Sequence, residues 1–226
     1  MSKIKWDQTG ERLAETGVDQ GVLYPFTGST YGAGVAWNGL TSVNEAPTGA
    51  EPSPFYADNQ KYLELMSEEE FAASIGCYTY PDEFKPCVGE VELVPGVTIS
   101  QQSHKLFGFS YRTKIVNDVD GVDHGFKIHL VYNALAGVTA RDHTTMNESP
   151  ELEEISYDIT TTKVPVTNGK PTSHLVIDST KFTAENAEKL QTLMDALYGK
   201  DAGEEGSPEA VPAKLLLPDE IAAILA

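Results

Sequence analysis

The sequence predicts a mainly β protein with a flanking helix near residues 183–198. Short runs of β-branched and aromatic residues recur along most of the chain and are separated by Gly and Pro. Two neighbouring runs alternate apolar and polar side chains with a period of two. Leucines recur at helical spacing near 183–198. At 226 residues the chain can bury a core without disulfides or metal ions.

The first expected strands cover residues 21–26 (GVLYPF) and 40–45 (LTSVNE), which are bounded by Gly and Pro. A third covers 71–79 (FAASIGCYT). Its alternate residues fall on one face, and they are Phe71, Ala73, Ile75 and Cys77. A short helical turn is expected to begin at Pro81, in the stretch PDEFKP.

The clearest alternation lies in 106–116 (LFGFSYRTKIV) and 126–132 (FKIHLVY). The residues expected to face a core are Phe107, Phe109, Tyr111 and Ile115 in the first run and Phe126, Ile128, Leu130 and Tyr132 in the second. Arg112, Lys114, Lys127 and His129 take the opposite face, as in half-buried strands. A polar turn joins the runs, so we expect a hairpin.

Further strands are expected at 154–166 and 173–178, with a turn at NGKP between them. In the helix near 183–198, Thr183 is the expected N-cap and Gly199 the expected stop. Residues 199–212 have the composition of a solvated linker. The apolar end, LLLPDEIAAILA, is too short for a stable free helix and should pack on the body. We expect one domain, 1–199, with a single hydrophobic core and an N-terminal arm, followed by an acidic linker and C-terminal arm at 200–226.

The chain is strongly acidic, with 34 Asp and Glu against 16 Lys and Arg and a net charge of −18. Such a surface repels phosphate, which argues against tight binding to nucleic acid or to anionic lipid. The N-terminus lacks the apolar segment of a signal peptide, and no apolar run has the length of a membrane span. We expect no association with a membrane.

Residues typical of catalytic or metal sites are scattered rather than gathered in motifs. Asp118, Asp120, Asp123 and His124 are interpreted as a solvated turn, because the spacing of an EF-hand calcium loop is missing. No two histidines have metal-site spacing, so a histidine site would have to be assembled from distant segments, and His129 is placed on the outer face of its strand. We expect no enzyme activity and no cofactor. Paired carboxylates of a jelly-roll hydrolase remain an alternative, because only geometry decides them.

Cys77 and Cys87 are the two cysteines. We interpret them as reduced, buried, small hydrophobic residues, and a disulfide between them is the alternative.

The stretch 46–69 does not read as part of a central strand. Pro47, Pro52 and Pro54 crowd its approach, and prolines are confined to edges of sheets. Its aromatic residues are Phe55, Tyr56 and Tyr62. They belong either to a local core or to a contact between subunits, where Tyr and Phe are enriched. The run Glu68–Glu70 reads as a solvated edge.

Nine stretches in order resemble the tail tube subunits (major tail proteins) of long-tailed phages with non-contractile tails, the siphophages. They are KIKWDQTGERLAETGVDQGVLYP, GVAWNGLTSVNE, FYADNQKYLELMS, YTYPDEF, PGVTISQQSHKLFGFSYRT, DHGFKIHLVYNALA, ISYDITTTKVPV, HLVIDSTKF and LLLPDEI. The similarity covers nearly the whole chain except the acidic linker. The type VI secretion tube protein is similar in architecture.

The resemblance implies two antiparallel sheets packed as a sandwich or partial barrel, with a helix on the flank. Subunits of this family form hexameric rings that stack into a tube, and an excursion between the second and third strands reaches the adjacent ring. With strand two at 40–45 and strand three at 71–79, that excursion is 46–69. The candidate ring-stacking residues are Pro54, Phe55, Tyr56, Asp58, Asn59, Tyr62, Leu63 and Leu65.

The implied partners are further copies of the chain, the tape measure, tail terminator and distal tail proteins, and phage DNA that passes through the lumen without specific binding. The implied location is the tail of the virion, after assembly in the host cytoplasm. A β-sandwich recognition module, such as a carbohydrate-binding domain or another tail component, is the alternative function.

Overall fold

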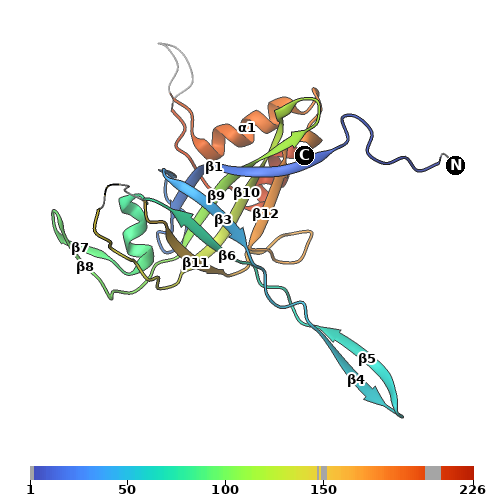
Figure 1. Ribbon diagram of the computed structural model, residues 1–226, viewed down its shortest axis with the longest axis horizontal. Helices are drawn as coiled ribbons and strands as arrows, with labels where there is room; N and C mark the ends of the chain where they lie inside the picture. The colour runs from blue at the N-terminus through green and yellow to red at the C-terminus, as the bar shows by residue number, and fades with distance from the viewer. Residues whose placement is uncertain (1–2, 147, 149–151, 202–209) are drawn as a thin grey trace.

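The computed structural model describes residues 3–146, 148, 152–201 and 210–226 (Figure 1). The fold is mainly β and its strands pair antiparallel, which confirms the predicted fold class. The strands are β1 (Leu13–Pro25), β2 (Val35–Trp37), β3 (Leu40–Glu45), β4 (Pro52–Ala57), β5 (Gln60–Met66), β6 (Ala72–Cys77), β7 (Val91–Val94), β8 (Val97–Ile99), β9 (Phe107–Asn117), β10 (Gly121–Ala136), β11 (Ile155–Thr161) and β12 (His174–Asp178). The helices are η1 (Asp82–Val88), η2 (Ser179–Lys181), α1 (Ala187–Tyr198) and α2 (Pro218–Leu225).

One bent sheet provides both layers of the sandwich-like body. Its strand order is β2-β1-β9-β10-β11-β6-β3, and β12 also pairs with β10. The long strand β10 pairs with β12 through Lys127–Val131 and with β11 through Ala134–Ala136. The sheet therefore turns over along β10, so that β11, β6 and β3 face β9 and β1. The body is not a closed barrel.

An inner cluster of buried side chains fills the space between the two layers. It contains Leu23, Trp37, Phe71, Ala73, Ile75, Cys77, Phe84, Cys87, Phe107, Phe109, Tyr111, Val131, Ala134, Ala136, Tyr157 and Ile159. The expected core faces of β6 and β9 are thus confirmed. Both cysteines are buried and free here, and burial raises the pKa of the Cys87 thiol to about 12. The helical turn expected near Pro81 is η1, which contributes Phe84.

The expectation of a single core is wrong, because an outer cluster covers the opposite face of the same sheet. It contains Val22, Tyr24, Ile128, Leu130, Tyr132, Val164, Ile177, Leu193, Leu197, Leu215, Leu216 and Ile221. Helices α1 and α2 and the segment before α2 form its lid (Figure 1). Two buried hydroxyls attach this lid to the sheet: Tyr24 donates to the carbonyl of Leu197 (2.8 Å) and Tyr132 to that of Leu216 (2.9 Å).

The outer cluster also corrects the half-buried interpretation of the central hairpin. The hairpin of β9 and β10 is confirmed, and Asp118 and Asp120 lie in its turn. The first half of β9, however, is buried on both faces, including Ser110. A Cβ added to Gly108 would lie 2.2 Å from a methyl group of Leu215, so the C-terminal segment approaches the strand directly there.

The helix α1 begins at Ala187 rather than at Thr183. The carbonyl of Thr183 accepts the amide of Asn186 (2.9 Å), so these residues form a turn before the helix and Thr183 is not the cap. The helix ends before Gly199, as predicted, and this glycine has a positive φ of 81°, but its ψ of 168° is not that of the expected left-handed cap. The C-terminal helix is α2, and it packs on the body as expected. Most of the expected linker, 202–209, lies outside the described residues.

Within the described part of the chain, no helix combines the length and apolar character that a membrane crossing requires.

Candidate functional site

The predicted excursion 46–69 contains a two-stranded hairpin, β4–β5, that projects far from the body (Figure 1). It leaves the sheet after β3 and returns to β6, two strands that pair with each other. In the register of the hairpin, Pro52 lies opposite Met66 and Phe55 opposite Leu63. The body therefore holds both ends of the excursion and leaves its tip in solvent.

The turn of the hairpin consists of Asp58 and Asn59, with φ of +50° and +60°. Two successive residues with positive φ form the tight turn whose twist matches that of paired strands, and Asp and Asn tolerate this conformation better than most residues. Asp58 and Asn59 thus form the tip as turn residues.

The side chains of the hairpin are exposed along its whole length. The exposed fraction is 50% for Phe55, 71% for Tyr56 and 78% for Tyr62. Leu63, Leu65 and Met66 are also exposed, and Pro54 lies between them on the opposite strand. Phe55, Tyr56 and Tyr62 therefore do not form a local core within the subunit, and that alternative is wrong. Met66 was not among the contact residues predicted from the sequence, although it continues the apolar pattern of YLELM.

The register gathers apolar side chains on one face. Phe55 and Leu63 are directly opposite, and Leu65 lies two positions further along the same strand. A register shift between Phe55 and Tyr56 leaves Tyr62 as an extra residue on β5. Such bulges increase the local twist and change the direction of a side chain.

The root of the hairpin is tied to the body by polar contacts. Thr48 and Glu70 exchange two backbone hydrogen bonds of 2.8 Å. The ammonium of Lys163 contacts the carboxylate of Glu68 at 2.7 Å and lowers the pKa of that carboxyl group. The run Glu68–Glu70 is exposed, as predicted for a solvated edge. These contacts fix the root of the hairpin. The apolar side chains further out stay exposed in the described part of the subunit.

A second exposed hairpin, β7–β8, was not predicted. Its exposed apolar residues are Val91, Leu93, Val94, Val97 and Ile99. The signal was present in VELVPGVTI, because Pro95 and Gly96 suit the two central positions of a tight turn and Gly96 has φ of +84°.

The candidate residues for chemistry fall into two places. Asp118 and Asp120 lie in the β9–β10 turn, as interpreted, whereas Asp123 and His124 lie in the first residues of β10; His124 contacts Asp120 at 3.0 Å. The expectation for His129 is wrong. The residue is 5% exposed, and its side chain lies on the inner face of β10, beside those of His174 and Glu45. The sheet bends over at β10, so the face that looked external is internal.

A scan of protein-family models gave no match, and neither did a search of curated proteins. Among solved structures, the chain is similar to the SPP1 tail tube, with 10% identity, a TM-score of 0.39 and coverage of 91% of this chain and 99% of that one. It is also similar to a chain of the extended sheath–tube complex of an extracellular contractile injection system (PVC), with 9% identity, a TM-score of 0.31 and coverage of 77% and 94%. At these values neither likeness assigns a function.

Proposed function

We propose that this chain is the structural subunit of a phage tail tube, and that it assembles with further copies of itself into stacked rings. The observation that carries the proposal is the β4–β5 hairpin, which presents Phe55, Tyr56 and Tyr62 to solvent at the end of a long projection. The resemblance of the sequence to siphophage tail tube subunits supports the same assignment and implies hexameric rings.

A projection of this kind suits stacking of identical rings. When the projecting surface and the receiving surface are different parts of one chain, the contact is head-to-tail and the assembly is open. Such an assembly grows along one direction, as a tube does. Tyr and Phe are enriched at the centre of protein interfaces, where they lose little conformational entropy for the area that they bury.

The ring-stacking contacts are assigned to Pro54, Phe55, Tyr56, Asp58, Asn59, Tyr62, Leu63 and Leu65, and Met66 extends this set. Of these, Phe55, Leu63 and Leu65 share one face of the hairpin. We assign them to the buried centre of the contact, and Asp58 and Asn59 to its polar end.

The charge of the chain is consistent with a conduit for DNA. Duplex DNA carries one negative charge per ~1.7 Å of its axis, so a strongly acidic protein does not retain it. In this proposal phage DNA passes through the lumen without specific binding, and the chain has a structural rather than an enzymatic role. The tape measure, tail terminator and distal tail proteins are the proposed further partners, in the tail of the virion.

The assembly is tested by replacing residues 50–66 with a short Gly-Ser linker. The expected result is a folded monomer that forms no tubes in negative-stain micrographs, whereas the unchanged chain forms tubes alone or with the initiator proteins of its phage. Thermal unfolding of the two monomers should be similar, because the hairpin contributes no side chain to either core cluster. Tubes built by the linker variant would refute the role of the hairpin. An unchanged chain that stays monomeric with the initiators present would refute the assembly.

A further inference from the structure

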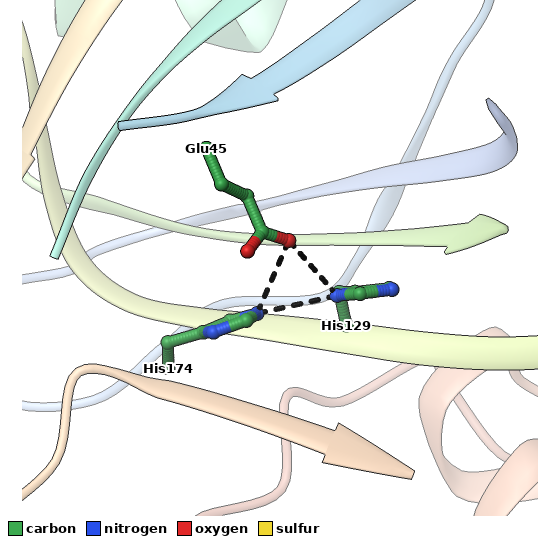
Figure 2. A group of neighbouring side chains, drawn as sticks. All are labelled: Glu45, His129 and His174. Carbon is green, nitrogen blue, oxygen red and sulfur yellow. Dashed lines mark hydrogen bonds and ion pairs between the residues drawn. The ribbon is translucent and has the colours of Figure 1, made fainter. Parts of the chain in front are cut away.

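Three side chains from distant parts of the sequence converge at the root of the hairpin (Figure 2). Glu45 is the last residue of β3, His129 lies on β10 and His174 begins β12. The Oε1 atom of Glu45 is 3.2 Å from Nδ1 of His129 and 3.9 Å from Nε2 of His174, and the two nitrogens are 3.3 Å apart. We refer to Glu45, His129 and His174 as the root triad.

The surrounding hydrogen bonds leave the Nδ1 atom of His129 without a proton. The hydroxyl of Thr113 donates to Glu15 (2.6 Å), so its oxygen is free to accept from Nε2–H of His129, 3.1 Å away. This tautomer is assigned from the hydrogen-bond network. The Nδ1 lone pair then faces the carboxylate of Glu45.

Nδ1 of His129 and Oε1 of Glu45 are then two hydrogen-bond acceptors only 3.2 Å apart. Such a contact is unfavourable unless a proton or a cation lies between the two atoms. The hydroxyl of Tyr111 donates to Oε1 of Glu45 (2.5 Å), and the N–H of His174 faces Nδ1 of His129 at 3.3 Å and Oε1 of Glu45 at 3.9 Å. The contact between Nδ1 of His129 and the carboxylate of Glu45 therefore has no proton of its own.

The spacing of the three atoms fits a transition-metal ion. Zinc lies about 2.0–2.2 Å from His nitrogen and carboxylate oxygen, so neighbouring ligands of a tetrahedral ion are about 3.3 Å apart. The 3.2 Å and 3.3 Å separations match this value, and the 3.9 Å separation requires a small movement of Glu45. The two imidazole rings are nearly parallel, with an interplanar angle of 13° and centroids 5.5 Å apart, so both rings must turn before their nitrogens converge on one ion.

The neighbours hold the root triad in the way that outer residues hold a metal site. His129 stacks on Tyr111, with ring centroids 4.5 Å apart, and His174 stacks on Phe71 at 4.3 Å. Tyr111 donates its hydroxyl to Glu45 (2.5 Å). The Nε2 atom of His129 also faces Glu15 at 3.4 Å, which is the carboxylate–histidine arrangement that raises the basicity of a ligating imidazole.

The electrostatic balance also favours a cation. Glu45 and Glu15 contribute two negative charges, and Lys127, which pairs with Glu15, contributes one positive charge. His174 also borders an open cavity of about 710 Å³, whose lining includes Phe71, Lys163 and Lys170.

We propose that Glu45, His129 and His174 bind a divalent transition-metal ion of the zinc class, with water at the remaining position. Glu45 directly precedes the excursion, and Phe71 lies two positions after its end. An ion bound here connects the strand that leads into the hairpin with the body strands β10 and β12. It therefore holds the root of the hairpin in one orientation.

The test uses the full chain without a histidine tag, freed of metal by a chelator and then titrated with Zn²⁺ and, separately, Co²⁺. The expected result is one bound ion per chain. With Co²⁺, the visible absorption spectrum should be that of a low-symmetry site with imidazole ligands. His174→Gln and Glu45→Gln should each weaken binding at least about a hundredfold, since even outer partners of metal ligands typically account for about 10–100-fold. Both residues lie at the rim, so the folded state of each variant can be verified by thermal unfolding in chelator.

His124→Gln is the matched control, because His124 also faces a carboxylate but lies near the start of β10, beside the β9–β10 turn. It should bind the ion as the unchanged chain does. The proposal would be overturned if the His174→Gln and Glu45→Gln variants bound Zn²⁺ as tightly as the unchanged chain does. It would also be overturned if the unchanged chain bound no ion at micromolar Zn²⁺. The measurement is made on the monomer, so its outcome is independent of whether the chain forms tubes.

Discussion

Truncating Phe55 to Ala should separate assembly from folding. The side chain is half-exposed in the subunit and faces Leu63 across the hairpin. An enclosed aromatic side chain buries about 150–250 Å². About half of that area is open here, so about 100 Å² remains to be covered by a neighbouring subunit. At about 25 cal/mol per Å², this gives about 2.5 kcal/mol as an upper value.

The cost measured on assembly should be smaller, because ordering and imperfect contacts reduce the gain on association. We expect about 1–2 kcal/mol for each subunit added, the usual range for a central aromatic contact. This corresponds to an approximately 5–30-fold higher critical concentration for tube formation. Sedimentation of tubes over a concentration series measures that value. The free energy of unfolding should change by less than about 0.5 kcal/mol, as for other exposed positions.

Tyr78→Ala is the control for this prediction. Tyr78 is 49% exposed, as Phe55 is, but it lies on the body directly after β6. Its truncation should leave the critical concentration unchanged. The reasoning fails if Phe55→Ala destabilises the monomer by several kcal/mol, because the ring would then belong to a core. It fails equally if the critical concentration is the same in both variants.

Three further predictions concern the body and its charge. Leu193→Ala should lower the free energy of unfolding in urea by about 2–5 kcal/mol, because this fully buried side chain joins α1 to the sheet; no change would mean that the outer cluster is not part of the cooperative core. The guanidinium of Arg112 donates two hydrogen bonds to the carboxylate of Asp19, at 2.7 and 2.8 Å, and lowers the pKa of that carboxyl group. The pair therefore stabilises the fold fully above the ordinary Asp pKa of about 3.9. This stabilisation is lost as the pH falls through the lower pKa of the folded state. Asp19→Asn should therefore lower Tm more near pH 6 than near pH 2; an equal decrease at both values would contradict the ion pair. Filter binding should detect no retention of duplex DNA at ~50 mM salt, and retention that is lost on adding salt would contradict a non-binding conduit.

The strands were predictable where one face of a strand is buried by residues close in the sequence. In β6 and β9 the apolar side chains recur every second residue, and burial keeps that pattern because a polar residue there would lose its hydration. The turn between β9 and β10 was predictable for a local reason too. Asp, Asn and Gly form turns through their own backbone preferences, whatever the rest of the chain does.

The outer cluster and the position of His129 were not predictable in this way. The cover over Gly108 comes from Leu215, more than a hundred positions later in the chain. His129 alternates with apolar residues, a pattern that normally indicates a solvent-facing side chain. In the middle of β10, however, both faces are buried, and alternation alone does not tell which face lies between the two layers. The root triad depends on the same bend in the sheet, so no spacing in the sequence reveals it.

The hairpin β4–β5 lacks the alternation of an ordinary strand because neither of its faces is buried within the subunit. A lone two-stranded hairpin is marginal in water, and each ordered residue loses roughly 1–2 kcal/mol of conformational free energy. Its prolines and its Asp58–Asn59 turn reduce that loss, but they supply no buried area. The exposed Phe55, Leu63 and Leu65 do supply it once a second surface covers them. The proposed assembly, in which a neighbouring subunit encloses this apolar face, would therefore account for a composition that the subunit alone does not explain.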